Sequence, residues 1–273
     1  MMHRAAAALI AGLLAGTACA AESEAAADAK PQEQSPASGP VAPYSAPYSR
    51  IELRRQNSER GTPDESSRTT LRLEHYFTGT LSRLRLDLPF PDEKTDFAGD
   101  PFSPRPGDLK LRADFRRFRL GSSQMSTDIE LIFPTADPSS LGQGKYQVSA
   151  ALHSGPGAAE FIYTFAPHQL RSEWSVRQTV SYAGDPARNN INNTKPELAL
   201  RDTIGSRHWV KLTFKPTIDW IQDGKTGAVM ELEGGWNASR DWRFSLMGGV
   251  RLWGEGVPGT YNRRVELVAG RAF

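Results

Sequence analysis

The chain has 273 residues, and its 33 Lys and Arg against 31 Asp and Glu give a formal net charge of +2. The basic residues are scattered and form no stripe, which excludes a nucleic-acid-binding surface. A mean hydropathy of −0.49 and the lack of a long apolar stretch exclude an inner-membrane protein built from helices. They do not exclude a β-barrel, which keeps polar side chains inside.

The first residues have the pattern of an export signal. Met1 to Arg4 form a basic start, Ala5 to Gly16 are almost entirely apolar, and Ala18-Cys19-Ala20 fits a cleavage site. We expect cleavage after Ala20, so that residues 1–20 are a signal peptide and the exported chain lacks cysteine. Lipidation of Cys19 is the alternative. Residues 21–47 are rich in Pro, Ala, Ser and Glu and are predicted to be a flexible tail.

From residue 48 onward, apolar and polar residues alternate, as in the run Arg-Leu-Arg-Leu-Asp-Leu at 83–88. A period of two is the pattern of β-strands. Glycine and proline separate the runs, which predicts about twelve strands. Their ranges are 68–78, 80–89, 107–119, 124–134, 143–153, 158–167, 170–183, 195–204, 206–220, 225–237, 240–252 and 260–273. Residues 48–56 are a further candidate strand. Including them would require removing or splitting another, because bacterial barrels usually have an even number.

We interpret residues 48–273 as an all-β, antiparallel transmembrane β-barrel of the bacterial outer membrane, with a soluble secreted β-protein as the alternative. The last strand is apolar on one face and ends on Phe273, which predicts that Phe273 is an assembly signal. Arg271 shares that face and is expected to reach toward lipid headgroups. Aromatic residues at or near the ends of runs predict interfacial girdles. They are Phe90, Phe133, Tyr182, Trp209, Trp220 and Trp253.

Charged residues of both signs occupy the opposite faces of these runs. In a barrel such positions line the lumen, where acidic and basic side chains are expected to pair. The candidate lumen-lining residues are Arg83, Arg85, Asp87, Arg112, Asp114, Asp128, Glu130, Glu173, Arg177, Lys211, Lys215, Glu231, Glu233 and Arg251.

Two segments carry turn and loop motifs. The first reads Glu-Leu-Ile-Phe-Pro-Thr-Ala-Asp at 130–137 and continues into Leu-Gly-Gln-Gly at 141–144, and the second reads Ser-Tyr-Ala-Gly-Asp-Pro-Ala-Arg at 181–188. Proline cannot donate a ladder hydrogen bond, so Pro134 is expected to end a strand, and Asp137 to begin a turn. Gly142 and Gly144 allow backbone geometry that other residues resist. Asp185 and Arg188 are expected to pair and to order their loop.

These segments resemble the outer-membrane, porin-like proteins of the "meta-pathway of phenol degradation" (transporter) family, over about residues 125–273. Ala136 stands where that family usually has glycine. The resemblance implies passage of small molecules across the outer membrane and does not identify the solute.

The leading hypothesis is a pore or facilitator for small solutes, with no enzyme activity, cofactor or metal. The expected partners are outer-membrane lipids and the barrel-assembly machinery. A lumen plugged by its own ion pairs would instead make a non-conducting structural barrel. A third alternative is an outer-membrane lipid hydrolase centred on His153 or His75. His153 and Ser154 are neighbours on a predicted strand and point to opposite faces, so they are not expected to form a catalytic pair.

Overall fold

A computed structural model describes residues 46–59, 65–92, 103–120, 123–154 and 162–273. The predicted signal peptide and all but the last two residues of the predicted tail lie outside these ranges. No helix in the described ranges is long and apolar enough to cross a membrane. The elements are β1 (Tyr48–Ser58), β2 (Ser66–Tyr76), β3 (Leu81–Pro91), β4 (Leu109–Phe115), β5 (Phe118–Leu120), β6 (Ser123–Phe133), the 3₁₀ helix η1 (Ser139–Leu141), β7 (Lys145–Ser154), β8 (Ile162–Phe165), β9 (His168–Gly184), β10 (Asn192–Ile204), β11 (His208–Asp219), β12 (Lys225–Asn237), β13 (Trp242–Trp253) and β14 (Arg263–Ala272).

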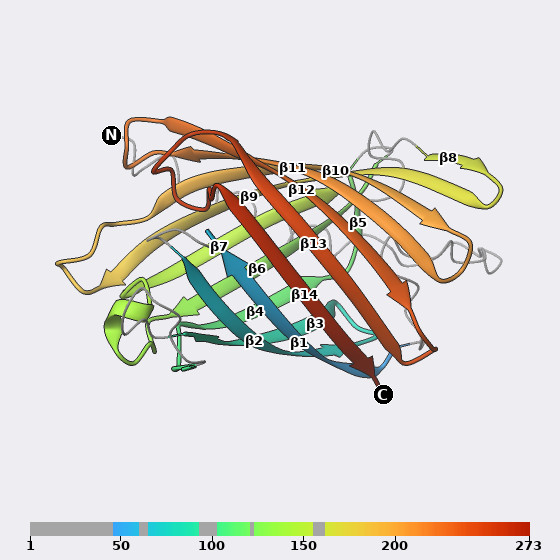
Figure 1. The fold of residues 1–273 in the computed structure, drawn as a ribbon, viewed down its shortest axis with the longest axis horizontal. Helices are drawn as coiled ribbons and strands as arrows, with labels where there is room; N and C mark the ends of the chain where they lie inside the picture. The colour runs from blue at the N-terminus through green and yellow to red at the C-terminus, as the bar shows by residue number, and fades with distance from the viewer. Residues whose placement is uncertain (1–45, 60–64, 93–102, 121–122, 155–161) are drawn as a thin grey trace, which may run out of the picture. The chain divides into compact units, whose positions relative to one another are not determined.

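The strands form one antiparallel sheet that closes on itself (Figure 1). Successive strands pair along the chain, β14 pairs with β1, and β9 pairs with β10. The short strands β5 and β8 lie off this circuit, because β5 pairs with β6 and β8 with β9. Twelve of the fourteen strands therefore make up the closed wall. The predicted antiparallel barrel and its strand number are confirmed.

The identity of one of the twelve strands differs from the main prediction. The candidate segment 48–56 is a wall strand, β1, and it pairs with β2 on one side and β14 on the other. Of the predicted strand 158–167, the described residues 162–167 are not in the wall. Instead, the four-residue strand β8 forms a hairpin with the start of β9, at the right-hand side of Figure 1. Apolar and polar residues alternate in both segments. The alternation therefore does not show which segment pairs with a neighbouring strand on each side.

The two faces of the wall differ sharply in polarity. On β14, Val265 and Leu267 are more than half exposed, whereas Glu266 and Val268, at the alternate positions, are buried. The largest fully buried side chains of the described chain are Glu52, Asp128 and Ser149, all of them polar. Soluble proteins bury apolar side chains and leave charged ones in water, so this distribution is the reverse of theirs. It suits a barrel with an apolar outer face and a polar inner face.

Exposed aromatic side chains gather at the two ends of the wall. We call the end that holds Tyr48 and Phe273 the terminal end, and the opposite end, near Ser58 and Arg263, the loop end. Trp236, Trp242, Phe244 and Phe273 are exposed at the terminal end, and Tyr146, Tyr182 and Trp253 are exposed at the loop end. Arg271 lies 5.6 Å from the centre of the Trp242 ring, so a cation–π contact holds it among the terminal aromatics.

The position of Trp209 differs from the prediction that this residue belongs to an interfacial girdle. Its ring is only 5% exposed and lies under the Arg201 guanidinium, 4.8 Å from the ring centre, so it belongs to the interior and not to a girdle. Gly235 sits directly opposite Trp209 in the β11–β12 register. A Cβ added to Gly235 would overlap the indole ring, so this close approach requires glycine.

Gly235→Ala is expected to destabilise the barrel by about 1–3 kcal/mol, because the added methyl group forces the buried Trp209 ring out of place. The matched control is Gly234→Ala on the outer face, where an added Cβ meets no atom within 4 Å. Heat-modifiable migration on gels measures both, as the temperature at which the folded band is lost. Equal temperatures for the two variants would contradict the interior placement of Trp209.

Candidate functional site

The candidate site is the inner face of the wall, where ion pairs connect most of the charged side chains. Several pairs join strands that are not neighbours. Arg243 on β13 reaches Glu52 on β1 at 3.2 Å across β14, and Arg85 on β3 reaches Glu130 on β6 at 2.9 Å across β4. Side chains on the concave face of a closed sheet converge, whereas those on the convex face diverge. Pairs that span an intervening strand therefore place these residues inside the barrel.

Glu52 is the centre of one group of ion pairs. Its carboxylate is 2% exposed and lies within 4 Å of four guanidinium groups, at 3.2 Å from Arg243, 3.4 Å from Arg54, 3.6 Å from Arg72 and 3.9 Å from Arg50. These guanidinium groups keep the carboxylate charged despite its burial, because they replace the water that it has lost. The sequence-based list omitted Glu52 because it lies in the segment whose membership in the barrel was undecided.

Asp128 is the centre of a second group. Its carboxylate is fully buried and lies 2.5 Å from Arg112, 2.9 Å from Arg177 and 2.5 Å from Nε2 of His153. Arg112 also lies 3.3 Å from Asp114. One negative charge thus organises two guanidinium groups and an imidazole from β4, β9 and β7.

A third group lies on the opposite part of the wall, around β11. Lys215 contacts Glu231 at 2.5 Å, and Glu197 lies 3.8 Å from Lys215 and 3.5 Å from Lys211. The hydroxyl of Tyr261, in the β13–β14 loop, donates to Glu231 at 2.5 Å. A loop-end residue is thereby tied to the inner wall.

All fourteen candidate lumen residues make polar contacts within the described chain. Arg83 contacts Asp114 at 2.9 Å, Asp87 contacts Arg72 at 2.7 Å, and Glu173 lies 4.0 Å from Lys211. Two members stand apart from the large groups. Glu233 accepts a hydrogen bond from Ser245 at 2.7 Å, and Arg251 lies 4.0 Å from the exposed Glu255. Arg50, Arg54, Arg68, Arg72, Glu74, Lys110, Lys195, Glu197, Arg243, Arg264 and Glu266 were not in the list, although the same alternation marks them.

The two motif segments lie together at the loop end. The amide of Asp185 donates to the carbonyl of Gly144 at 2.9 Å, and the Arg188 guanidinium donates to the carbonyl of Ser139 at 3.2 Å. A Cβ added to Gly184, whose φ is +123°, would overlap the carbonyl oxygen of Gly144. Segments about 40 residues apart in the sequence therefore form one packed loop structure.

The individual motif residues differ in how they act. Pro134 directly follows the end of β6, and η1 begins two residues after Asp137, at Ser139. The side chains of Asp185 and Arg188 form no ion pair in the structure. Instead, the Asp185 carboxylate accepts the amide of Ala187 at 2.8 Å, and the Arg188 amide donates to the Asp185 carbonyl at 3.2 Å. The spacing builds a tight turn, and this turn leaves the guanidinium free to reach Ser139.

Asp108 is a loop-end residue that the sequence did not single out. It is 7% exposed, and its carboxylate accepts the amides of Gln143 at 2.6 Å and Ala136 at 3.3 Å. A Cβ on Gly142 would overlap this carboxylate. Gly142 is needed for this close approach and not for an unusual φ, since its φ is −119°.

Within the described ranges, the contacts of His153 and His75 do not make a catalytic triad. Ser154 accepts the amide of Trp174 at 2.9 Å, while the His153 imidazole contacts Asp128. Ser49 and His75, on neighbouring strands, do meet, with 2.9 Å between Oγ and Nδ1. A serine hydrolase also needs a group that orients the imidazole, and in the described ranges His75 contacts this serine and the edge of Phe77. Those ranges hold no group of three or more His, Cys, Asp or Glu suited to a metal ion.

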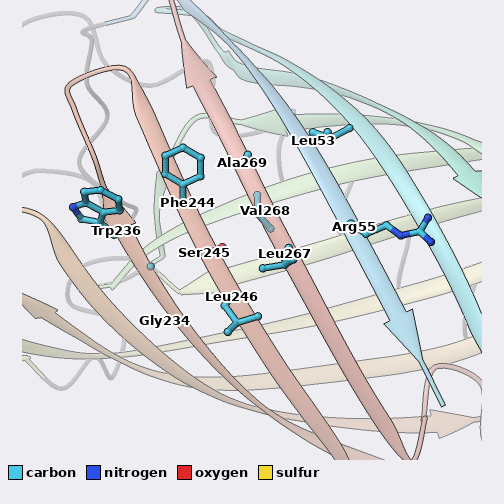
Figure 2. Close-up of a pocket in the computed structure, with 11 residues that line it drawn as sticks. Leu53, Arg55, Gly234, Trp236, Phe244, Ser245, Leu246, Leu267, Val268 and Ala269 are labelled. Atoms are coloured by element: carbon cyan, nitrogen blue, oxygen red, sulfur yellow. The ribbon is translucent and has the colours of Figure 1, made fainter. Parts of the chain in front are cut away.

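A hollow of about 620 Å³ lies on the outer face across β12, β13, β14 and β1 (Figure 2). Trp236, Phe244, Leu246 and Leu267 project around it, and Gly234 leaves its floor without a side chain. Its lining is apolar apart from Arg55 and Ser245. It is part of the apolar outer surface, and its two polar side chains are engaged elsewhere, Arg55 with Asp92 and Ser245 with Glu233.

Comparisons with known proteins agree with this architecture. No protein-family model matches the chain. No curated protein matches it either. Among solved structures, the COG4313 outer membrane channel from Pseudomonas putida F1 is 14% identical, with a TM-score of 0.63 over 89% of this chain and 100% of that chain. The KdgM porin is 7% identical, with a TM-score of 0.50 over 82% of this chain and 99% of its own. The NanC porin is 10% identical, with a TM-score of 0.50 over 82% of this chain and 98% of its own. At such identities the likeness shows a shared barrel fold.

Asp128→Asn is expected to destabilise the barrel by about 3–5 kcal/mol, because it removes the charge that two buried guanidinium groups share. The control is Glu255→Gln, which alters a carboxylate that is 88% exposed and lies at the edge of ion-pair distance from Arg251. Urea unfolding followed by tryptophan fluorescence measures both variants. The central role of Asp128 is wrong if its variant unfolds at the same urea concentration as the control.

Proposed function

We propose that this chain forms an outer-membrane pore through which small solutes pass. The observation that carries the proposal is the combination of a closed wall, an apolar outer face and a charged inner face. A closed sheet satisfies its backbone hydrogen bonds internally, as a structure in lipid must. Exposed aromatic residues at both ends correspond to the two interfaces of a bilayer. The shared fold with outer-membrane channels and porins supports the same assignment.

The orientation follows from the lengths of the connections. In outer-membrane barrels the turns on the periplasmic side are short and the extracellular loops are long. The β2–β3, β10–β11 and β12–β13 turns at the terminal end span three or four residues, whereas the β3–β4, β6–β7 and β13–β14 connections at the loop end span 17, 11 and nine. One connection at the terminal end, β7–β9, is also long, at 13 residues, and contains β8. The terminal end therefore faces the periplasm, and the packed motif loops face the outside.

The inner face carries positive and negative side chains all around the barrel, so it offers a hydrated surface to polar solutes. We propose that the fourteen candidate residues line this path, that no enzyme activity or cofactor is involved, and that the lipid bilayer surrounds the wall. We also propose that the chain is a divergent member of the "meta-pathway of phenol degradation" family. The joint packing of its two motif segments at the loop end supports that assignment.

Purified, refolded protein is expected to give discrete conductance steps in planar bilayers, because a lumen lined by charged groups stays hydrated. Protein denatured by boiling before addition is the control and gives none. The absence of steps at every voltage and salt concentration would favour a non-conducting structural barrel. A phospholipase activity that Ser49→Ala abolishes would favour a hydrolase.

Phe273→Ala is expected to lower the amount of folded protein in the outer membrane, because Phe273 joins the closing seam and presents its ring to lipid. Its amide donates to the carbonyl of Ser49 at 3.0 Å, and its side chain is 57% exposed. Phe244→Ala is the matched control, since Phe244 is an outward phenylalanine at the same end. Fractionation followed by heat-modifiable migration measures the folded amount. An equal loss in both variants would show a general need for lipid-facing rings and no special role for Phe273 in recognition by the assembly machinery.

A further inference from the structure

Four basic side chains near the loop end differ from the rest of the inner face. Arg68 is the third residue of β2, Lys110 the second of β4, Lys195 the fourth of β10 and Arg264 the second of β14. All four strands begin at the loop end, so the four residues lie at a similar depth. We call them the cationic ring. In the circuit of strands, β14, β2 and β4 occupy one side, and β10 lies further around.

Each member of the ring is half-buried and forms no ion pair with the part of the chain that the structure describes. Arg68 donates to the amide oxygen of Gln56 at 2.9 Å, and its Nε is buried without a partner. Arg264 donates to the hydroxyl of Ser58 at 3.2 Å and lies 3.6 Å from the centre of the Tyr261 ring. These partners are neutral, so they leave the positive charges uncompensated.

The four charges act on one another. Lys195 lies within electrostatic range of Lys110 and Arg264, and Arg68 within range of Lys110 and Arg264. Arg177 and Arg85 add further positive charge nearby.

The acidic groups that face the ring are already engaged. Glu130 is paired with Arg85 at 2.9 Å, Asp87 with Arg72 at 2.7 Å, and Glu266 with Arg54. The ring therefore has a local excess of positive charge, unlike the groups around Glu52, Asp128 and Glu231.

The β13–β14 loop brings backbone close to this ring. A Cβ placed on Gly259 would lie 3.2 Å from Nζ of Lys195, so the loop passes directly beside this ammonium group. Val257 and Tyr261 of the same loop are buried, which fixes the loop in that position. The Lys195 side of the ring therefore lies directly beside the backbone of the β13–β14 loop.

We propose that the cationic ring is a binding and selection site for small anions that carry carboxylate or phosphate groups. This inference rests on the proposed pore, and it adds the charge class of the solute. Repulsion among partly desolvated like charges is relieved when an anion enters between them. Two guanidinium forks and two ammonium groups supply donors for oxyanions without requiring one geometry.

The first test is the reversal potential in a potassium chloride gradient across a planar bilayer. The wild-type pore is expected to prefer chloride, and Lys110→Gln combined with Lys195→Gln to lower the chloride-to-potassium permeability ratio by about threefold or more. The control is Lys225→Gln, which removes a positive charge from an exposed residue at the same end and is expected to leave the ratio unchanged. A conducting wild type without anion preference, or a double variant with the wild-type ratio, overturns the inference.

The second test does not depend on conductance. Citrate, at constant ionic strength, is expected to raise the temperature at which the folded band of the wild type is lost, but not that of the double variant. The Lys225→Gln control should respond as the wild type does. A citrate effect without channels would remove the pore and keep the anion site. Equal citrate effects on the wild type and the double variant, or none on either, would overturn the anion site even if the protein conducts.

Discussion

The structure depends on closure of the sheet between β14 and β1. An open edge presents unpaired amide and carbonyl groups, and in lipid no water is available to satisfy them. Nine residue pairs, from Arg50 with Ala272 to Ser58 with Arg264, join the two strands. The backbone contacts between Ser49 and Phe273 extend the pairing to the terminal end. Once the sheet is closed, every strand has an inside and an outside, and the alternation acquires a physical meaning.

Closure also explains why so many charges are tolerated in the interior. On a concave face, side chains from strands two apart can meet, and each carboxylate can have several basic neighbours. Glu52 and Asp128 show this directly, because each is nearly inaccessible and surrounded by basic groups from several strands. A flat sheet with the same sequence would pair only adjacent strands and leave many of these charges without compensation. The cationic ring differs, because the same geometry leaves its four positive charges without ion-pair partners in the described chain.

Much of the fold could be predicted from the sequence. The period of two predicted which residues of a strand share a face, because side chains on a strand alternate between faces whatever the strand pairs with. Three predictions about strands and side-chain faces failed or stayed open, because contacts between segments far apart in the sequence decide them. Residues 48–58 are in the wall and 162–167 are not, since of the two only the first segment has partners on both sides. Trp209 was assigned to a girdle, but the facing Gly235 makes room for it inside. The Ser49–His75 contact was invisible because it joins different strands.

The sequence by itself determined the fold class, an approximate strand number and which charged residues share a face of each strand, because these follow from local alternation and turn chemistry. It also located the two motif segments, although not their mutual packing. The tertiary structure decided which charges are compensated and which are not. That outcome depends on register and on contacts across intervening strands, such as those of Arg85 with Glu130, and neither can be read from one strand alone.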